Sequence, residues 1–147
     1  MIVMIHSLLR WAIVFLGIWA IMNAISGLSG KRAFSRSDKM SGLFFMIAYD
    51  LQLLLGLILY FTGPWFNKLT NDFGGTMKNA PARFFSLEHM MMMLIAWALV
   101  HIGYAKVKKA EDHAKHKKML IFFGIAFLIT MAAIPWPFRA ALGKGWY

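Results

Sequence analysis

The sequence predicts an all-α protein: a four-helix transmembrane bundle with both termini on the outer, periplasmic side. Three observations predict this architecture. Of the 147 residues, 60% are apolar, and they gather in four blocks. Each block has about 20 residues, which is the length that a helix needs to cross a bilayer. The connections between the blocks alternate between strongly and weakly basic, as in chains that cross a membrane repeatedly.

The four blocks are continuous apolar runs, unlike the alternating strands of a membrane barrel. Backbone polar groups find no water in lipid, and a helix satisfies them within one segment. We therefore expect a single membrane domain over residues 1–147, with transmembrane helices at about 2–28, 41–63, 84–105 and 119–138.

The first two helices are expected to end at small or helix-breaking residues. The first ends within the serine- and glycine-rich stretch 26–30, and the second ends at Gly63, because Pro64 cannot continue a helix. The first run lacks the basic segment and cleavage site of a signal peptide, so we interpret it as a retained helix. The connection 64–83 is too polar to span. Its aromatic residues favour a segment that lies in the interface or caps the mouth of the bundle.

The third helix is expected to begin at Ser86 as its N-cap, with Glu88 in the first turn, where a carboxylate complements the helix dipole. The fourth is expected to end where two prolines flank Trp136. An aromatic belt at the outer interface is predicted from five residues: Trp11, Trp65, Trp136, Trp146 and Tyr147.

The positive charge is concentrated on one side of the predicted bundle. Ten of the sixteen basic residues lie in or beside two connections: Lys31, Arg32, Arg36, Lys39, Lys106, Lys108, Lys109, Lys115, Lys117 and Lys118. By the positive-inside rule these connections face the cytoplasm, which predicts a multi-pass protein of the bacterial inner membrane. Basic segments beside a bilayer contact anionic lipids, so we expect the lipid bilayer and no nucleic acid as partner. The absence of cysteine excludes disulfides, iron–sulfur clusters and thiol catalysis.

Polar residues within the spans form an expected outer layer: His6, Arg10, Arg83, Glu88 and His89. Both histidines are expected within about one turn of the outer ends of their helices. Neutral imidazole is the commonest protein ligand for metals, and two imidazoles at one depth on packed helices can clamp a haem through its iron. We expect His6 and His89 to be the iron ligands, with Arg10 and Arg83 holding the propionates. The alternative is a buried Arg10–Glu88 ion pair to which the histidines hydrogen-bond.

An inner layer is expected from four further residues: Asp50, Gln52, His101 and His116. His101 lies about 18 Å along its helix from His89, a spacing that would suit a second haem with His116 or His113 as the partner ligand. Alternatively, His116 lies in a solvated loop, and Asp50 and His101 form a proton relay. A further alternative is a neutral Asp50 that is hydrogen-bonded to Gln52, to Tyr49 or to a neighbouring helix.

Four stretches carry a resemblance to a known family: His6–Trp11 (HSLLRW), Leu51–Phe61 (LQLLLGLILYF), Glu88-His89 with its methionines, and Ile134–Arg139 (IPWPFR). The chain resembles, over nearly its whole length, a family of small four-helix membrane proteins of Bacteroidetes-type bacteria labelled cytochrome B. The resemblance implies a b-type cytochrome, with His6 and His89 as the ligands and Arg10 and Glu88 beside them. The family often carries histidine at the position of Asp50, so the resemblance implies that an inner ligand is missing here.

Three functions compete. The first is an electron-transfer subunit of a respiratory chain that holds one haem b, or two in the alternative, with Glu88 as an outer-side proton acceptor if a quinone is oxidised there. The second is a cofactor-free accessory subunit of a larger respiratory or secretion complex. The third is a proton or small-solute carrier that uses Asp50 and His101. All three favour an electron-transfer, accessory or carrier role over that of a stand-alone enzyme.

Overall fold

The computed structural model describes residues 1–142, which form seven α-helices, one π-helical turn and one 3-10 turn, with no β-strand among them. The all-helical prediction is confirmed. The expected belt residues Trp146 and Tyr147 lie outside the described residues.

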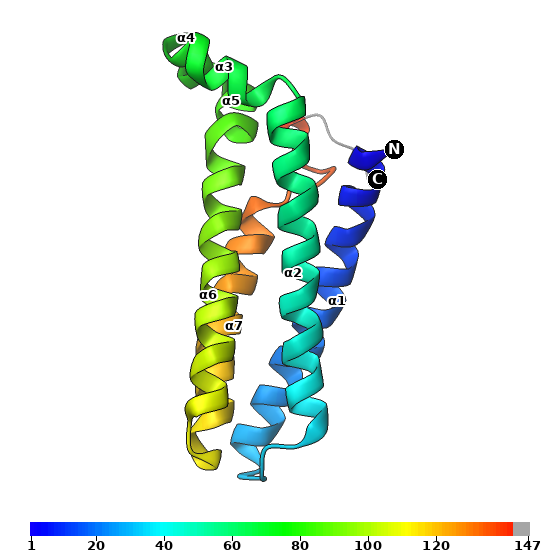
Figure 1. Ribbon diagram of the computed structural model, residues 1–147, viewed down its shortest axis with the longest axis vertical. Coiled ribbons are helices and arrows are strands. Elements are labelled where there is room, and N and C mark those ends of the chain that lie inside the picture. The colour runs from blue at the N-terminus through cyan, green and yellow to red at the C-terminus, as the bar shows by residue number, and fades with distance from the viewer. Residues whose placement is uncertain (143–147) are drawn as a thin grey trace.

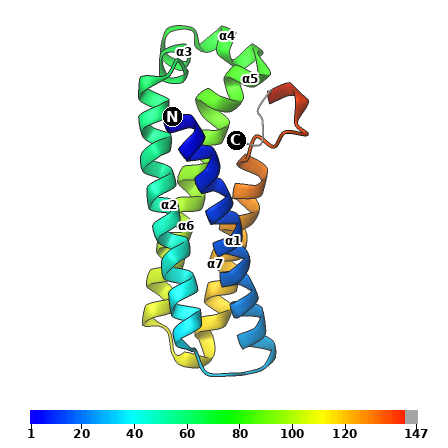
Figure 2. The same cartoon turned by 90° about the vertical axis from the view of Figure 1, so that its right-hand side faces the viewer.

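Four helical segments are long and apolar enough to cross a membrane. They are α1 (Ile2–Ser29), α2 (Arg36–Thr62), α7 (Asp112–Ala133) and the segment Ala80–Lys109, which joins α5 (Ala80–Arg83), the π-helical turn η1 (Phe84–Glu88) and α6 (His89–Lys109). They form one antiparallel bundle (Figures 1 and 2). Both α1 and α6 pack against α2 and α7, so α1 and α6 lie diagonally across the bundle.

The two ends of the bundle differ in character. Two short helices, α3 (Trp65–Asn71) and α4 (Phe73–Lys78), lie with α5 over one end, which we call the cap end (Figure 1). The 3-10 turn η2 (Ala140–Leu142) contacts α5 there. The prediction that the connection 64–83 caps the bundle mouth is confirmed. The opposite end, formed by the connections 30–35 and 110–111 with the neighbouring lysines, is the basic end.

The first two helices end as predicted, but the second begins earlier than expected. Helix α1 stops at Ser29 with Gly30 as its C-cap, and α2 stops at Thr62 before Gly63. Helix α2 begins at Arg36, not near residue 41, because Ser35 and Asp38 form a capping box. The Ser35 hydroxyl accepts from the Asp38 amide at 3.3 Å, and the Asp38 carboxylate accepts from the Ser35 amide at 2.7 Å.

The fourth helix is displaced toward the N-terminus relative to the expected span 119–138. It begins at Asp112, within the lysine-rich segment that the sequence analysis assigned to a loop, and ends at Ala133. A residue before proline disfavours the helical conformation, and Ile134, which precedes Pro135, is extended with ψ 126°. The first proline therefore ends the helix before the Pro-Trp-Pro segment is reached.

The third span begins at Ala80, so the predicted N-cap at Ser86 is wrong. Asn79 caps it instead, since its side-chain oxygen accepts from the Ala82 amide at 2.9 Å. Ser86 is fully buried in η1, and its carbonyl accepts a hydrogen bond from the Tyr60 hydroxyl at 2.8 Å. His89 consequently lies nine residues into its span, about 13 Å from the end at a rise of about 1.5 Å per residue.

The hydrogen bond from Tyr60 stabilises the π-helical turn, so Tyr60→Phe should destabilise the protein by about 1 kcal/mol, the usual net value for a buried hydrogen bond. Thermal unfolding of the purified protein in detergent, followed by tryptophan fluorescence, measures the loss. Tyr104→Phe is the matched control, because the Tyr104 hydroxyl makes no hydrogen bond within residues 1–142 and its ring contacts Lys108. Equal melting temperatures for the two variants would contradict the assignment.

A buried polar network closes the basic end. Asp38 accepts from both terminal nitrogens of Arg32, at 2.6 and 2.8 Å, and its carboxylate lies 3.2 Å from Nε2 of His116. The Asp38 hydrogen bond raises the pKa of Arg32. His116 is 2% exposed in α7, so the expectation of a solvated loop histidine is wrong. The ring fits only because Gly27 lacks a side chain, since a Cβ there would stand 2.1 Å from Nε2.

Candidate functional site

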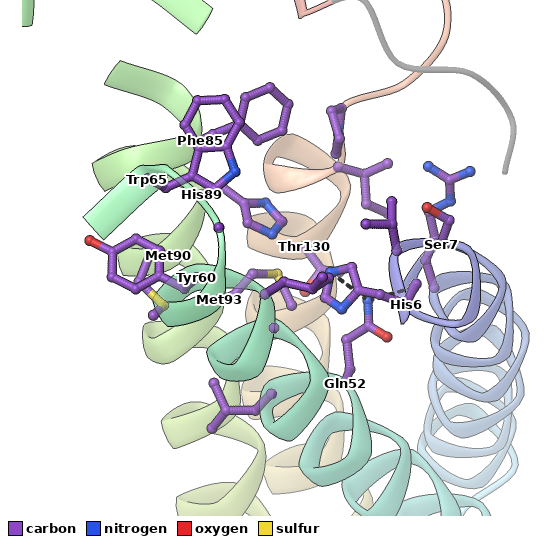
Figure 3. Close-up of a pocket in the computed structure, with 18 of the residues that line it drawn as sticks. His6, Ser7, Gln52, Tyr60, Trp65, Phe85, His89, Met90, Met93 and Thr130 are labelled. Atoms are coloured by element: carbon purple, nitrogen blue, oxygen red, sulfur yellow. Dashed lines mark hydrogen bonds between the residues drawn. The ribbon is translucent and has the colours of Figure 1, made fainter. Parts of the chain in front are cut away.

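A cavity of about 280 Å³ lies inside the bundle, in the half nearer the cap end. It is lined by α1, α2, η1, α6 and α7, with Trp65 of α3 at its upper edge (Figure 3). Most of the lining is aliphatic, aromatic or methionine. The polar lining residues are few: His6, Ser7, Arg10, Gln52, His89 and Thr130.

The structure brings His6 and His89 together in this cavity. Their ring centroids are 6.3 Å apart and the ring planes are inclined by 72°. The two helices that carry them are diagonal in the bundle, so the rings meet across its centre, between α2 and α7 (Figure 3). The site is deeper than expected, because the third span continues for nine residues beyond His89 toward the cap end.

A main-chain contact orients His89. Its Nδ1 lies 2.8 Å from the carbonyl oxygen of Ala133, at the last turn of α7. A carbonyl only accepts, so Nδ1 carries the proton and donates it. In the neutral ring this leaves the lone pair on Nε2. The end of α7 thereby selects the tautomer that can bind a metal or accept a proton through Nε2.

Gln52 orients His6. The side-chain nitrogen of Gln52 lies 3.3 Å from Nε2 of His6 and 3.1 Å from the carbonyl oxygen of the same residue. Within residues 1–142, the buried Nδ1 of His6 has no hydrogen-bond partner. A side-chain amide nitrogen only donates, so Nε2 of His6 accepts and the neutral ring carries its proton on Nδ1.

Gly56 makes room for the His6 ring. A Cβ at this position would lie 3.3 Å from Cε1 of His6, closer than an ordinary van der Waals contact. Gly56 is one turn along α2 from Gln52, so both contacts to His6 come from the same face of that helix. This face of α2 is shaped around the imidazole.

The predicted grouping of Gln52 with Asp50 in one inner layer is wrong. Residues two apart on a helix differ by about 200° around the axis, so the two side chains leave α2 in nearly opposite directions. Gln52 is buried at 6% exposure and contacts His6, whereas the Asp50 side chain is 46% exposed. The angular separation was available in the sequence and indicates that the two side chains face opposite sides of α2.

The arginines divide between two environments. Arg10 is 7% exposed and lines the cavity, with its guanidinium 5.5 Å from the ring of Trp11 and 6.0 Å from that of Trp136. Arg83 donates to Glu88 at 2.6 Å and to the Met77 carbonyl at 3.0 Å. The alternative of a buried Arg10–Glu88 ion pair is therefore wrong. Among the described residues, neither Arg83 nor Glu88 lines the cavity.

The other candidate residues lie outside the cavity lining. Asp50 accepts a hydrogen bond from the Trp97 indole at 2.7 Å and lies 3.2 Å from Nε2 of His101. Both partners are on α6, so the contacts agree with both alternatives, the Asp50–His101 pair and a hydrogen bond from Asp50 to a neighbouring helix. His101 and His116 have different carboxylate partners, Asp50 and Asp38. Trp97 connects the two regions, because it also lines the cavity.

No family model matches the chain, and no curated protein and no solved structure shows significant similarity to it. The resemblance to the cytochrome B family therefore stays a prediction.

Proposed function

We propose that the protein is an electron-transfer subunit of cytochrome b type, in which His6 and His89 hold one haem b inside the bundle. The separation of the two rings is the observation that carries the proposal. Imidazole nitrogen binds a metal at about 2 Å, so two rings on opposite sides of one metal have centroids roughly 6 Å apart. The centroids of His6 and His89 are 6.3 Å apart.

The surroundings of each ring suit a ligand. A metal-binding histidine usually donates its other ring N–H to a carbonyl or carboxylate, and His89 donates Nδ1–H to Ala133. Iron would bind His6 through Nε2, which carries the lone pair, in place of the contact from the Gln52 amide, and Gly56 gives the ring space. A haem supplies four iron ligands of its own, so two imidazoles complete the set. These features fit a haem better than a bare metal ion.

Several other residues would tune such a site. Arg10, the buried arginine in the lining, would neutralise a propionate by charge-assisted hydrogen bonds. Gln52 would hold the His6 ring in position. The bound iron would carry one electron by alternating between ferric and ferrous states, and the apolar lining would set its potential. A quinone or a second membrane protein is the partner class that such a carrier would serve.

The distribution of basic residues indicates how the bundle would be oriented in the membrane. The basic end holds most of the lysines and arginines, so the positive-inside rule assigns it to the cytoplasm and the cap end to the periplasm of a bacterial inner membrane. The histidine site would then lie in the periplasmic half of the bilayer.

A reduced-minus-oxidised visible spectrum of the purified protein tests the proposal. The full chain, produced in cells supplied with iron and a haem precursor, should show the sharp absorption bands of a six-coordinate b-type haem after dithionite reduction. Haem extraction should give about one haem per chain. A folded, colourless protein that also fails to take up added haemin would refute the proposal.

A further inference from the structure

A second cavity, of about 250 Å³, lies at the basic end between α2, α6 and α7. Its inner wall is apolar and includes Val107, Met119 and Phe123. Lysines line it as well, one from each of the three helices: Lys39, Lys108 and Lys115. The cavity thus combines an apolar wall with cationic groups close to the ends of the spanning helices.

The lysines have few acidic partners. Lys115 lies 3.4 Å from Asp112 and holds its ammonium 5.4 Å from the ring of Phe34. Lys108 has its ammonium 5.9 Å from the ring of Tyr104. Within residues 1–142, neither Lys39 nor Lys108 forms an ion pair. The like charges of Lys39 and Lys108, which no acidic residue compensates in this part of the chain, favour the entry of an anion between them.

The carboxylate that lines this cavity does not cancel the positive charge. Asp38 is fully buried and accepts two hydrogen bonds from Arg32, so its charge is already compensated. Its remaining contacts are to Ser35 and His116. An anion in the cavity would therefore meet the lysine ammonium groups and a neutralised Asp38–Arg32 pair.

We propose that this cavity binds the phosphate group of an anionic phospholipid. The phosphate lies among the ammonium groups of Lys39, Lys108 and Lys115, and the glycerol backbone with the first acyl carbons packs on the apolar wall. Basic pockets between transmembrane helices at the cytoplasmic surface bind anionic headgroups in this way. Inorganic phosphate is also negatively charged, but it has no apolar part to pack on the cavity wall. A phospholipid is therefore the expected ligand. The proposal is independent of haem binding.

Native mass spectrometry of the detergent-purified chain tests this site with phosphatidylglycerol, phosphatidylcholine and inorganic phosphate as separate probes. Phosphatidylglycerol should be retained roughly tenfold better than phosphatidylcholine, since each lysine near an anionic headgroup contributes measurable affinity. The triple variant Lys39→Ala/Lys108→Ala/Lys115→Ala should lose that preference. The matched control Lys106→Ala/Lys109→Ala/Lys117→Ala removes the same charge from the same end without touching the cavity lining, and should retain the preference.

Each contrary outcome overturns the proposal. If both triple variants lost the preference for phosphatidylglycerol equally, the net charge of the basic end would attract the lipid, and the cavity would not be a specific site. If the Lys39/Lys108/Lys115 variant still preferred phosphatidylglycerol, the lipid would bind outside this cavity. Inorganic phosphate that binds while phosphatidylglycerol does not would assign the cavity to a soluble anion. If the triple variant fails to fold, Lys39→Gln/Lys108→Gln changes two exposed positions and allows the same comparison.

Discussion

The His89→Ala protein should purify without haem, and so should His6→Ala. Each substitution removes one of the two imidazoles whose rings stand 6.3 Å apart. The proposed haem b would have no covalent link to the protein, so the loss of one of its two proposed iron ligands would leave little to retain it. The reduced-minus-oxidised absorbance per chain should fall to background in His89→Ala and at least severalfold in His6→Ala.

His101→Ala is the matched control for these two variants. It removes an imidazole from the same bundle. His101 contacts Asp50 and the Trp97 carbonyl, and it is not among the residues that line the cavity in the described part of the chain. Its haem content should equal that of the unmodified protein. Undiminished absorbance in His89→Ala, or a loss in His101→Ala as large as in His89→Ala, would remove the basis for assigning His6 and His89 as ligands.

Gly27→Ala should destabilise the protein more than any other single added methyl group at its basic end. The new Cβ would stand 2.1 Å from Nε2 and 2.2 Å from Cδ2 of His116, so the ring must move. Overpacking a core costs about 1–3 kcal/mol. Displacing His116 also takes a hydrogen-bond partner from Asp38, which is fully buried. We expect a loss of about 3 kcal/mol, measured as a lower melting temperature in detergent.

Gly124→Ala is the control for this substitution. Gly124 is in α7, and a Cβ built there meets nothing within 4 Å. Alanine is a better helix former than glycine by up to about 1 kcal/mol, so this variant should be as stable as the unmodified protein or slightly more so. Equal melting temperatures for Gly27→Ala and Gly124→Ala would show that His116 does not occupy the position against Gly27.

Local sequence signals predicted the helix ends where one residue dominates the backbone. Gly30 and the Gly63-Pro64 pair ended their helices as expected. The prediction failed at Ser86, because Asn79 offered an equally good cap seven residues earlier and a π-helical turn continued the helix through Ser86. It also failed in the lysine-rich segment before residue 119, because α7 begins at Asp112 and includes these lysines in its first turns.

The sequence indicated that His6 and His89 lie together, but it did not indicate how deep they lie or which other residues contact them. His6 and His89 stood out because ionisable groups in lipid-spanning segments need a partner. Their depth was misjudged, because the expected cap at Ser86 lies seven residues after Asn79, the residue that caps the third span. Gln52, which contacts His6, was assigned to the wrong layer.

By itself, the sequence determined that four helices are long and apolar enough to cross a membrane, that one end of the bundle is basic, and that imidazoles lie in the first and third of these helices. Only the tertiary structure decided that His6 meets His89 across the diagonal, that Gln52 faces inward while Asp50 faces outward, and that His116 packs on Gly27. The reason is physical. Lipid is as apolar as a protein core, so a membrane helix carries no strong polar stripe to reveal which face is inside. Rotation and axial offset are set by packing between helices that are distant in the chain.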